Sequence, residues 1–349
     1  MWKDDKAAGT VECSNWMGQH RDMIARFPIS SLAIAGSHNS GSYAIHGSRP
    51  QRAWDCDPSI ARYFHLPGFP TIVRRWAKCQ TSSIRDQLLN GIRYLDVRLS
   101  CDTDNGRMFL CHAVCFISFD DFCTQLIDFS DSHPSEIILV DVNHVYVDPN
   151  APAHSWAIKN HYHTILDRLI EAIGRNRIVD RECSPSTTIS KILEARPRII
   201  LIFDNAEAAE SRHIWGPDTI TSAWPNSNKM TRVLDHAVLE CVSNRDASRL
   251  HVMQLLLTCK PSDIAKNIYG NLINHSRRLT YHAPQFIFEQ CRKDGALLRH
   301  FNVVIMDDCC HSNGALALAA IEINLMKYES MAYPPIYHSL HSPQQTPPN

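Results

Sequence analysis

The sequence lacks any uninterrupted apolar run of the roughly 20 residues that a membrane-spanning helix needs. Its first six residues, MWKDDK, have no apolar segment behind them, so we expect no secretory signal. An excess of one charge is missing too, because 35 Lys and Arg residues stand against 36 Asp and Glu residues in a chain of 349. This balance argues against a generally basic nucleic-acid binder.

Paired cysteine motifs are also missing, although the chain has 13 cysteines, an odd number without tight regular spacing. This usage indicates reduced thiols in a cytoplasmic protein rather than a disulfide framework. One local group includes His112 and has soft ligands that can collect zinc, which is an alternative, but it has no C-x-x-C pair, and free cysteine is a common small core residue. The other members of that group are Cys101, Cys111, Cys115 and Cys123.

No G-x-G-x-x-G turn and no P-loop follows an early strand, which disfavours an open nucleotide-binding sheet. Strand-length runs rich in Ile, Val and Leu alternate instead with helical patterns, as in a parallel sheet covered by helices. The chain is therefore predicted to be an α/β protein with a (β/α) TIM-type barrel, irregular or incomplete, in a single domain. The predicted strands are 32–35, 93–99, 108–112, 137–142, 198–203, 251–258 and 302–306, and the clearest helices 83–90, 158–173, 229–242 and 284–300.

Three segments follow from this pattern. Residues 1–13 form an N-terminal extension, residues 14–330 form the barrel domain, and residues 331–349 form a flexible Pro-rich tail. The stretch 48–81 is long and irregular, and we expect it to be an excursion between the first two strands.

Polar side chains follow the strands at the end where barrels place their chemistry. The first strand ends at His38 and Asn39, and the last is followed by Asp307 and Asp308. In the second strand, residues alternate between faces, so Tyr94, Asp96 and Arg98 point into the barrel, whereas Leu95, Val97 and Leu99 pack under helices. The run at 108–112 supplies His112.

Two histidines, an arginine and a carboxylate suit metal-free phosphoryl transfer, with one imidazole as base and the other as acid. The guanidinium can bind phosphate oxygens bidentately. The same residues have ordinary structural explanations, because Asp96 and Arg98 can form a structural ion pair and the chain has 19 histidines. Residues alone leave both interpretations open.

The order of the motifs along the chain resembles that of a known protein family. Ser37-His38-Asn39-Ser40 followed by Gly91-Ile92-Arg93-Tyr94-Leu95-Asp96-Val97-Arg98 is similar to phosphatidylinositol-specific phospholipase C X-domain proteins, above all the small eukaryotic members. The similarity covers residues 14–327. It continues through three further segments, namely 136–144, 224–226 and 302–307.

The resemblance implies a role for each matching residue. His38 is implied as the base that deprotonates the inositol 2-hydroxyl, and His112 as the acid for the diacylglycerol oxygen. Arg98 matches the arginine that stands in place of calcium in metal-independent bacterial relatives. Asp307 or its neighbour Asp308 is implied as the partner of His38, and Asp96 as an acidic position of the site.

Asn39 departs from the pattern, because most small members have Asp there. A neutral amide supplies no charge, so we expect it to leave the acid His112 less protonated than a carboxylate would. Inward residues Asp141, Asn143 and Asp204 are expected to line a head-group pocket. Trp215 and Trp224 lie in a loop region, where they can either pack or contact a lipid surface.

The resemblance thus implies a phosphoric diester hydrolase acting on phosphoinositide lipids at a transient membrane surface, with no cofactor, no metal and no nucleic-acid partner. Two alternatives stay open. The chain can be a weak or inactive phosphoinositide-binding pseudoenzyme, which Asn39 favours. It can also be a metal-dependent glycerophosphodiesterase, although Arg98 would repel the cation.

Overall fold

The computed structural model describes residues 12–102, 106–148, 161–243 and 245–332. Its centre is a single sheet in which seven strands pair in parallel, in the order β7-β6-β3-β1-β10-β9-β8. These strands are β1 (Ile34–Ser37), β3 (Tyr94–Cys101), β6 (Ile138–Val147), β7 (Ile199–Phe203), β8 (Ile220–Ala223), β9 (Leu250–Leu255) and β10 (Val303–Met306).

The sheet curls into a barrel that is not closed. Within the described residues, β7 and β8 share no ladder, and one isolated parallel bridge between Ile202 and Trp215 lies near their seam. The expectation of an irregular or incomplete TIM-type barrel is therefore confirmed. β1 lies in the middle of the sheet, between β3 and β10, with Ser37 opposite both Leu95 and Met306.

An antiparallel extension interrupts the regular alternation of strands and helices. It consists of β2 (Gln51–Arg52), β4 (Met108–His112) and β5 (Val114–Ser118), and β4 runs antiparallel to β3. The predicted strand at 108–112 thus exists, but as a hairpin strand and not as part of the parallel barrel. A short apolar run has the same appearance in either direction of pairing, which is why the sequence did not distinguish them.

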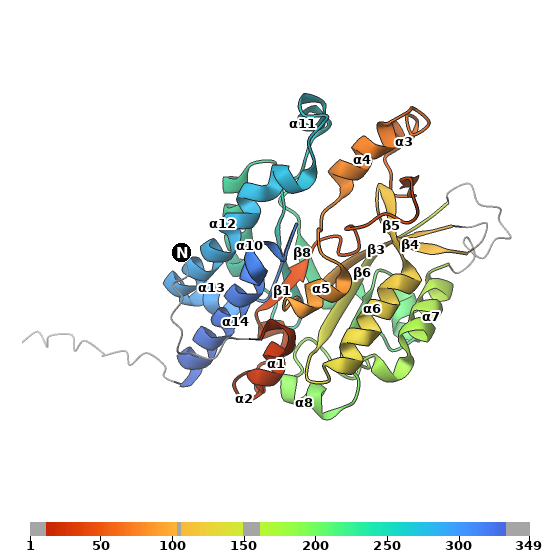
Figure 1. The fold of residues 1–349 in the computed structure, drawn as a ribbon. Helices are drawn as coiled ribbons and strands as arrows, with labels where there is room; N and C mark the ends of the chain where they lie inside the picture. The colour runs from red at the N-terminus through yellow and green to blue at the C-terminus, as the bar shows by residue number, and fades with distance from the viewer. Residues whose placement is uncertain (1–11, 103–105, 149–160, 244, 333–349) are drawn as a thin grey trace, which may run out of the picture.

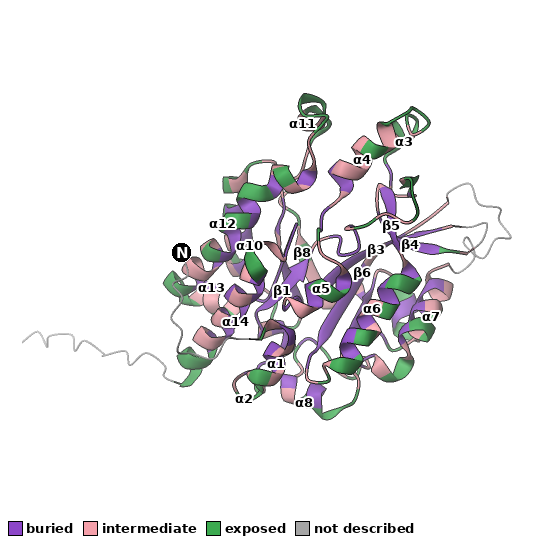
Figure 2. Cartoon of the chain, in the orientation of Figure 1, coloured by how far each residue is buried: buried purple, intermediate pink, exposed green. Residues whose placement is uncertain are grey.

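Two apolar layers show how side chains alternate along the strands. Inside the barrel, Ile34 and Tyr94 belong to a cluster that Trp16 and Met17 join. Outside it, the side chains of Leu95, Val97 and Leu99 belong to a second cluster that includes helix residues, as the alternation predicted. Figure 2 shows the strands buried, whereas the helices expose one side to solvent.

Helices surround the sheet (Figure 1). Their bounds are α1 (Trp16–Gln19), α2 (Arg21–Ile24), α3 (Pro58–Ala61), α4 (Phe69–Ala77), α5 (Ile84–Leu89), α6 (Phe119–Ser132), α7 (His161–Ile173), α8 (Ile189–Glu194), α9 (Ala206–Ser211), α10 (Met230–Ser243), α11 (Pro261–Lys266), α12 (Leu272–Lys293), α13 (Gly295–His300) and α14 (His311–Ala332). Residues 158–160 of one predicted helix lie outside the described residues.

One predicted helix has wrong bounds. The segment 284–300 was expected to form one helix beginning at a proline, the usual place for that residue. Instead, α12 runs through Pro284 and ends before Asp294, whose carboxylate accepts hydrogen bonds from the backbone of Ala296 and Leu297 and so begins α13. A buried apolar face holds α12 in place despite its internal proline.

The irregular stretch 48–81 contains β2, α3 and α4. Together with α11, which follows β9, α3 and α4 project from one end of the barrel, and α1, α2 and α8 lie at the other end (Figure 1). No helix among the described residues is long and apolar enough to span a membrane. All thirteen cysteines are free thiols. Most of the predicted N-terminal extension and Pro-rich tail lies outside the described residues.

Candidate active site

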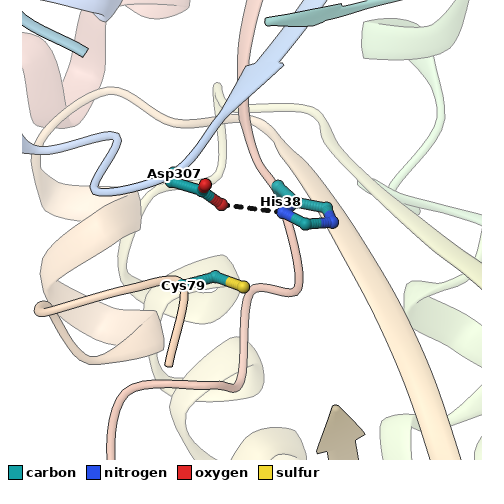
Figure 3. A group of neighbouring side chains, drawn as sticks. All are labelled: His38, Cys79 and Asp307. Carbon is teal, nitrogen blue, oxygen red and sulfur yellow. Dashed lines mark hydrogen bonds and ion pairs between the residues drawn. The ribbon is translucent and has the colours of Figure 1, made fainter. Parts of the chain in front are cut away.

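His38 and Asp307 come together because their strands are neighbours. His38 directly follows β1, Asp307 directly follows β10, and the last residues of these strands are paired. The carboxylate Oδ1 of Asp307 lies 2.7 Å from Nδ1 of His38 (Figure 3). Asp308 points elsewhere, accepting a hydrogen bond from Thr81 and lying 3.6 Å from His311. Geometry therefore makes Asp307, and not Asp308, the carboxylate partner of His38.

A buried glutamine holds the two strand ends together. The Gln80 amide donates to the backbone carbonyls of His38, at 2.7 Å, and Met306, at 3.1 Å. Its oxygen accepts from the backbone N–H of Cys309. These bonds fix the backbone on both sides of the His38–Asp307 pair, so Gln80 is a positioning residue that the sequence did not reveal.

Left-handed backbone follows each of three candidate site residues. Asn39, Ala113 and Asp308 have φ values of 44°, 57° and 48°. Each comes directly after His38, His112 or Asp307, at the point where the chain turns away from its strand. Asn and Asp tolerate this conformation better than most residues, whereas for Ala it is strained. Such strain is concentrated at functional sites in proteins.

Asn39 contacts the base histidine instead of the acid histidine. Its Nδ2 lies 2.9 Å from Nε2 of His38 and 3.6 Å from Sγ of Cys79. The expectation that Asn39 stands beside His112 therefore differs from the structure, where no hydrogen bond joins the two among the described atoms. The left-handed backbone of Asn39 turns its side chain back toward the preceding residue, an effect that no sequence motif displays.

Asp96 lies beneath His38 in a buried polar network. Its carboxylate accepts from the backbone N–H of Asn39 at 2.8 Å and from the Asn143 amide, and lies 4.0 Å from Nε2 of His38. Asn143 is the extra residue of a β-bulge, because Val97 pairs with Val142 and Arg98 with His144. The bulge aims Asn143 at Asp96, as bulges beside functional sites commonly do.

Asp141 continues this network below the site. Its carboxylate accepts from the Tyr94 hydroxyl at 2.5 Å and lies 3.5 Å from the Asn143 amide. Burial raises the pKa of Asp141 to about 7, against the hydrogen bond from Tyr94, which lowers it. Asp141 thus titrates near neutrality, and its neutral form can also donate a hydrogen bond.

Arg98 supplies the positive charge of the site. Burial alone would lower the pKa of its guanidinium, but nearby Asp96 and Tyr146 raise it above the ordinary value. Arg98 Nε is buried and has no hydrogen-bond partner among the described residues. A buried donor without a partner is available to an oxyanion that enters the site.

His112 faces His38 across the site. The two ring centroids are 6.1 Å apart. His112 Nδ1 lies 2.8 Å from the carbonyl of Ala77 and 3.4 Å from Sγ of Cys79. This bond places the proton on Nδ1 and leaves Nε2 for exchange with a ligand. Burial, followed by the positive charge of Arg98, lowers the pKa of His112.

A cleft of about 720 Å³ opens above these residues. His38, Arg98, His112 and Asp307 belong to its lining, together with His144 and many apolar residues of α4, α11 and α12. Asp141, Asn143 and Asp204 do not line it. The carboxylate Oδ2 of Asp204 instead lies 3.8 Å from Nδ1 of His144. The role of these three residues in holding a head group therefore stays a prediction.

One group of side chains has the composition of a metal site. Ligand atoms of His38, Cys79 and Asp307 all lie within 4.8 Å of one another, the one such group within the described ranges (Figure 3). Burial, reinforced by Asp307, raises the pKa of the Cys79 thiol well above its ordinary value. A cation here would have to displace the thiol proton and the His38–Asp307 bond, close to Arg98. The donors therefore fit a resident metal poorly.

The structure separates the two tryptophans for which the sequence left packing and lipid contact open. Trp215 is fully buried, whereas 55% of Trp224 is exposed at the end of β8, where it lines the cleft. Cys79 and Gln80, both in contact with site residues, belong to the stretch 48–81 that carries no recognisable motif. No sequence signal would have found them.

An incomplete α/β barrel thus brings two histidines and an arginine together in one cleft, a combination suited to phosphodiester cleavage. Proteins of similar sequence include phospholipases. The chain is 27% identical over 293 residues to human PI-PLC X domain-containing protein 2, covering 82% of this chain and 92% of that protein. It is 26% identical to the variant-surface-glycoprotein phospholipase C of Trypanosoma cruzi, covering 76% and 71%. These relatives confirm the resemblance that the motifs indicated.

The fold has the same relatives. Phosphatidylinositol-specific phospholipase C from Listeria monocytogenes superimposes with a TM-score of 0.60 at 15% identity, covering 90% of this chain and 99% of that one. This match supports the barrel fold. No family model matches the chain.

Proposed function

We propose that the chain is a phosphoric diester hydrolase of the phospholipase C type, which cleaves phosphatidylinositol-like lipids to diacylglycerol and inositol (cyclic) phosphate. The observation that carries this proposal is the pair of histidines facing each other in one cleft, with Asp307 on His38 and Arg98 beside them. The relatives named above support the same class of reaction.

The proposed chemistry follows from which nitrogens carry protons. His38 donates Nδ1–H to Asp307, so its Nε2 can accept the proton of a substrate hydroxyl as that oxygen attacks phosphorus. The bond from phosphorus to the diacylglycerol oxygen breaks, and protonated His112 supplies a proton to that oxygen. Arg98 would bind the phosphate oxygens, whose charge increases in the transition state. We propose that no metal ion takes part.

The surroundings of the cleft support action at a membrane surface. Several exposed apolar residues belong to segments next to α3, α4, α11 and the end of β8, on the side where α3, α4 and α11 project (Figure 1), and apolar side chains in such positions suit contact with a lipid surface. They are Tyr63, Leu66, Trp224, Ile268 and Tyr269. The free thiols support a reducing, cytoplasmic environment.

One observation favours a second candidate function, an inactive phosphoinositide-binding protein. The Asn39 amide lies on His38 Nε2, the nitrogen that the base mechanism needs. For catalysis, a substrate hydroxyl has to replace this contact. If it does not, the cleft binds the lipid without cleaving it.

Product analysis on phosphatidylinositol distinguishes the two candidates. We expect diacylglycerol and inositol 1,2-cyclic phosphate to form in the presence of a divalent-cation chelator, and His38→Ala to stop both the formation and the opening of the cyclic phosphate. Binding without either product would establish the second candidate. Activity that a chelator abolishes and calcium restores would contradict the metal-independent mechanism.

A further inference from the structure

The cleft above the histidines has two chemically different parts. The catalytic side chains and His144 belong to strands or to the residues that follow them, whereas α4, α11 and α12 contribute an almost wholly apolar wall. This apolar wall consists of Phe69, Ile72, Val73, Trp76, Pro261, Ile264 and Leu272. A sugar phosphate alone would leave the wall in contact with water, which is unfavourable for apolar surface.

An unpaired donor lies within the apolar wall. Trp76 is 7% exposed, and its indole Nε1–H has no hydrogen-bond partner among the described residues. Thr258, which also lines the cleft, has a buried hydroxyl oxygen in the same condition. Buried donors nearly always have a partner, so an unpaired one inside a cleft points to a ligand that accepts hydrogen bonds.

Contacts between α4 and the α11–α12 region hold the apolar wall together. Arg75 of α4 donates to the backbone carbonyls of Ile268 and Tyr269, at 3.1 and 3.4 Å, in the connection between α11 and α12. The Trp76 ring also lies against His275 of α12, with centroids 5.8 Å apart. The apolar wall is thus formed before any ligand binds, as in most small-molecule sites.

We propose that the apolar wall holds the diacylglycerol part of the substrate, with Trp76 Nε1–H donating to an ester carbonyl of that lipid. An acyl ester has both properties that the wall requires, a hydrocarbon chain and an acceptor oxygen near its polar end. The leaving group is then bound by the protein itself, close to His112, and need not stay in the bilayer. This inference rests on the proposed function for the position of the phosphate.

Binding of the leaving group alone tests the inference without catalysis. The probe is dihexanoylglycerol below its aggregation concentration, compared by calorimetry with the ether analogue dihexylglycerol. We expect the ester to bind more tightly, and Trp76→Phe, which keeps an aromatic ring but loses the N–H, to weaken ester binding roughly three- to tenfold. The ether should bind Trp76→Phe and the unchanged protein equally. Trp54→Phe, at a residue that does not line the cleft, is the matched control.

A second variant tests the apolar wall independently of Trp76. Ile264→Asp places a charge on a half-buried position of α11 and should weaken binding of both lipids by more than tenfold. Leu239→Asp, at an exposed apolar residue of α10 that does not line the cleft, should have no effect on binding of either lipid. Equal losses in both Asp variants, or no preference for ester over ether, would overturn the inference.

The outcomes also separate this inference from the proposed function. If the protein binds dihexanoylglycerol through Trp76 but cleaves no phosphodiester, the lipid-binding wall is supported and the proposed enzyme function is contradicted. If it cleaves a soluble aryl inositol phosphodiester but binds no diacylglycerol, the enzyme function is supported and the lipid-binding role of the apolar wall is contradicted.

Discussion

The Asn39 amide donates to Nε2 of His38 at 2.9 Å, on the opposite side of the imidazole from Asp307. Both ring nitrogens of His38 are therefore engaged before a substrate arrives. This arrangement fixes the ring and its tautomer, but it also makes the side chain at position 39 a competitor of the substrate hydroxyl.

Asn39→Asp should change the acidic limb of the pH–rate profile. A carboxylate beside Nε2 would stabilise the protonated imidazole, so a higher pH would be needed to obtain the free base. We expect the acidic limb to move to higher pH, measured on a soluble aryl inositol phosphodiester. A shift of the alkaline limb alone would mean that position 39 acts on His112, as the sequence suggested.

Arg98→Ala should lower kcat/KM on the order of 10²–10⁴-fold, because it removes a charge that stabilises the phosphate in the transition state. Arg98→Lys keeps the charge without the bidentate geometry and should recover part of the loss. Arg85→Ala, at an exposed position of α5, is the control and should have the rate of the unchanged protein. Similar losses for Arg98→Ala and Arg85→Ala would contradict a role in the reaction.

His112→Ala should affect substrates according to their leaving groups. Diacylglycerol needs a proton to depart, whereas an aryl alcohol does not, so an aryl phosphodiester should be cleaved with a much smaller loss. Equal losses on both substrates would exclude His112 as the acid.

The pH profile gives a second test of His112. Since burial and Arg98 lower its pKa, the protonated acid is present only below the ordinary value of 6.5 and is lost as the pH rises through the lowered value. The activity on lipid should therefore decline above an acidic optimum. A lipid-cleaving profile that stays flat to pH 8 would contradict this direction.

Glu136→Ala should destabilise the fold. Glu136 and Arg93 form a fully buried ion pair at 2.6 Å, and Glu136 also accepts from the backbone of Met17 and Gly18. Removing one partner leaves a buried charge uncompensated, which costs about 3–5 kcal/mol. The free energy of unfolding in urea measures the loss.

Asp131→Ala is the matched control for the buried pair. Asp131 pairs with Arg177 at 2.7 Å at the surface, where an ion pair contributes less than about 1 kcal/mol. Comparable losses of unfolding free energy in Glu136→Ala and Asp131→Ala would show that burial of the ion pair does not determine its contribution to stability.

The sequence predicted the strands better than the site. Apolar runs of strand length identified the seven parallel strands except β8, because Ile220–Ala223 is short and only half-buried. His38, Arg98 and His112 follow or occupy strands and carry motifs, so they could be selected. Their orientations depend on contacts between distant segments, such as Gln80 with His38 and Met306, and no local pattern contains that information.

The side chain of Asn39 illustrates what the sequence alone does not predict about the site. Its identity was visible, and so was its departure from the common pattern, but the neighbour that it contacts depends on a left-handed φ. The apolar wall was hidden for another reason. It combines α4, from a stretch that was expected to be irregular, with α11, which lies about 190 residues later in the sequence.

The seam between β7 and β8 determines where this barrel opens first. Edge strands without a ladder partner exchange their amide protons and separate at lower free energy than central ones. β1, β3 and β10, which carry or position His38, Arg98 and Asp307, lie in the middle of the seven parallel strands, as far along the strand order from the seam as possible. We therefore expect local opening at the seam to leave the relative positions of the reacting groups unchanged.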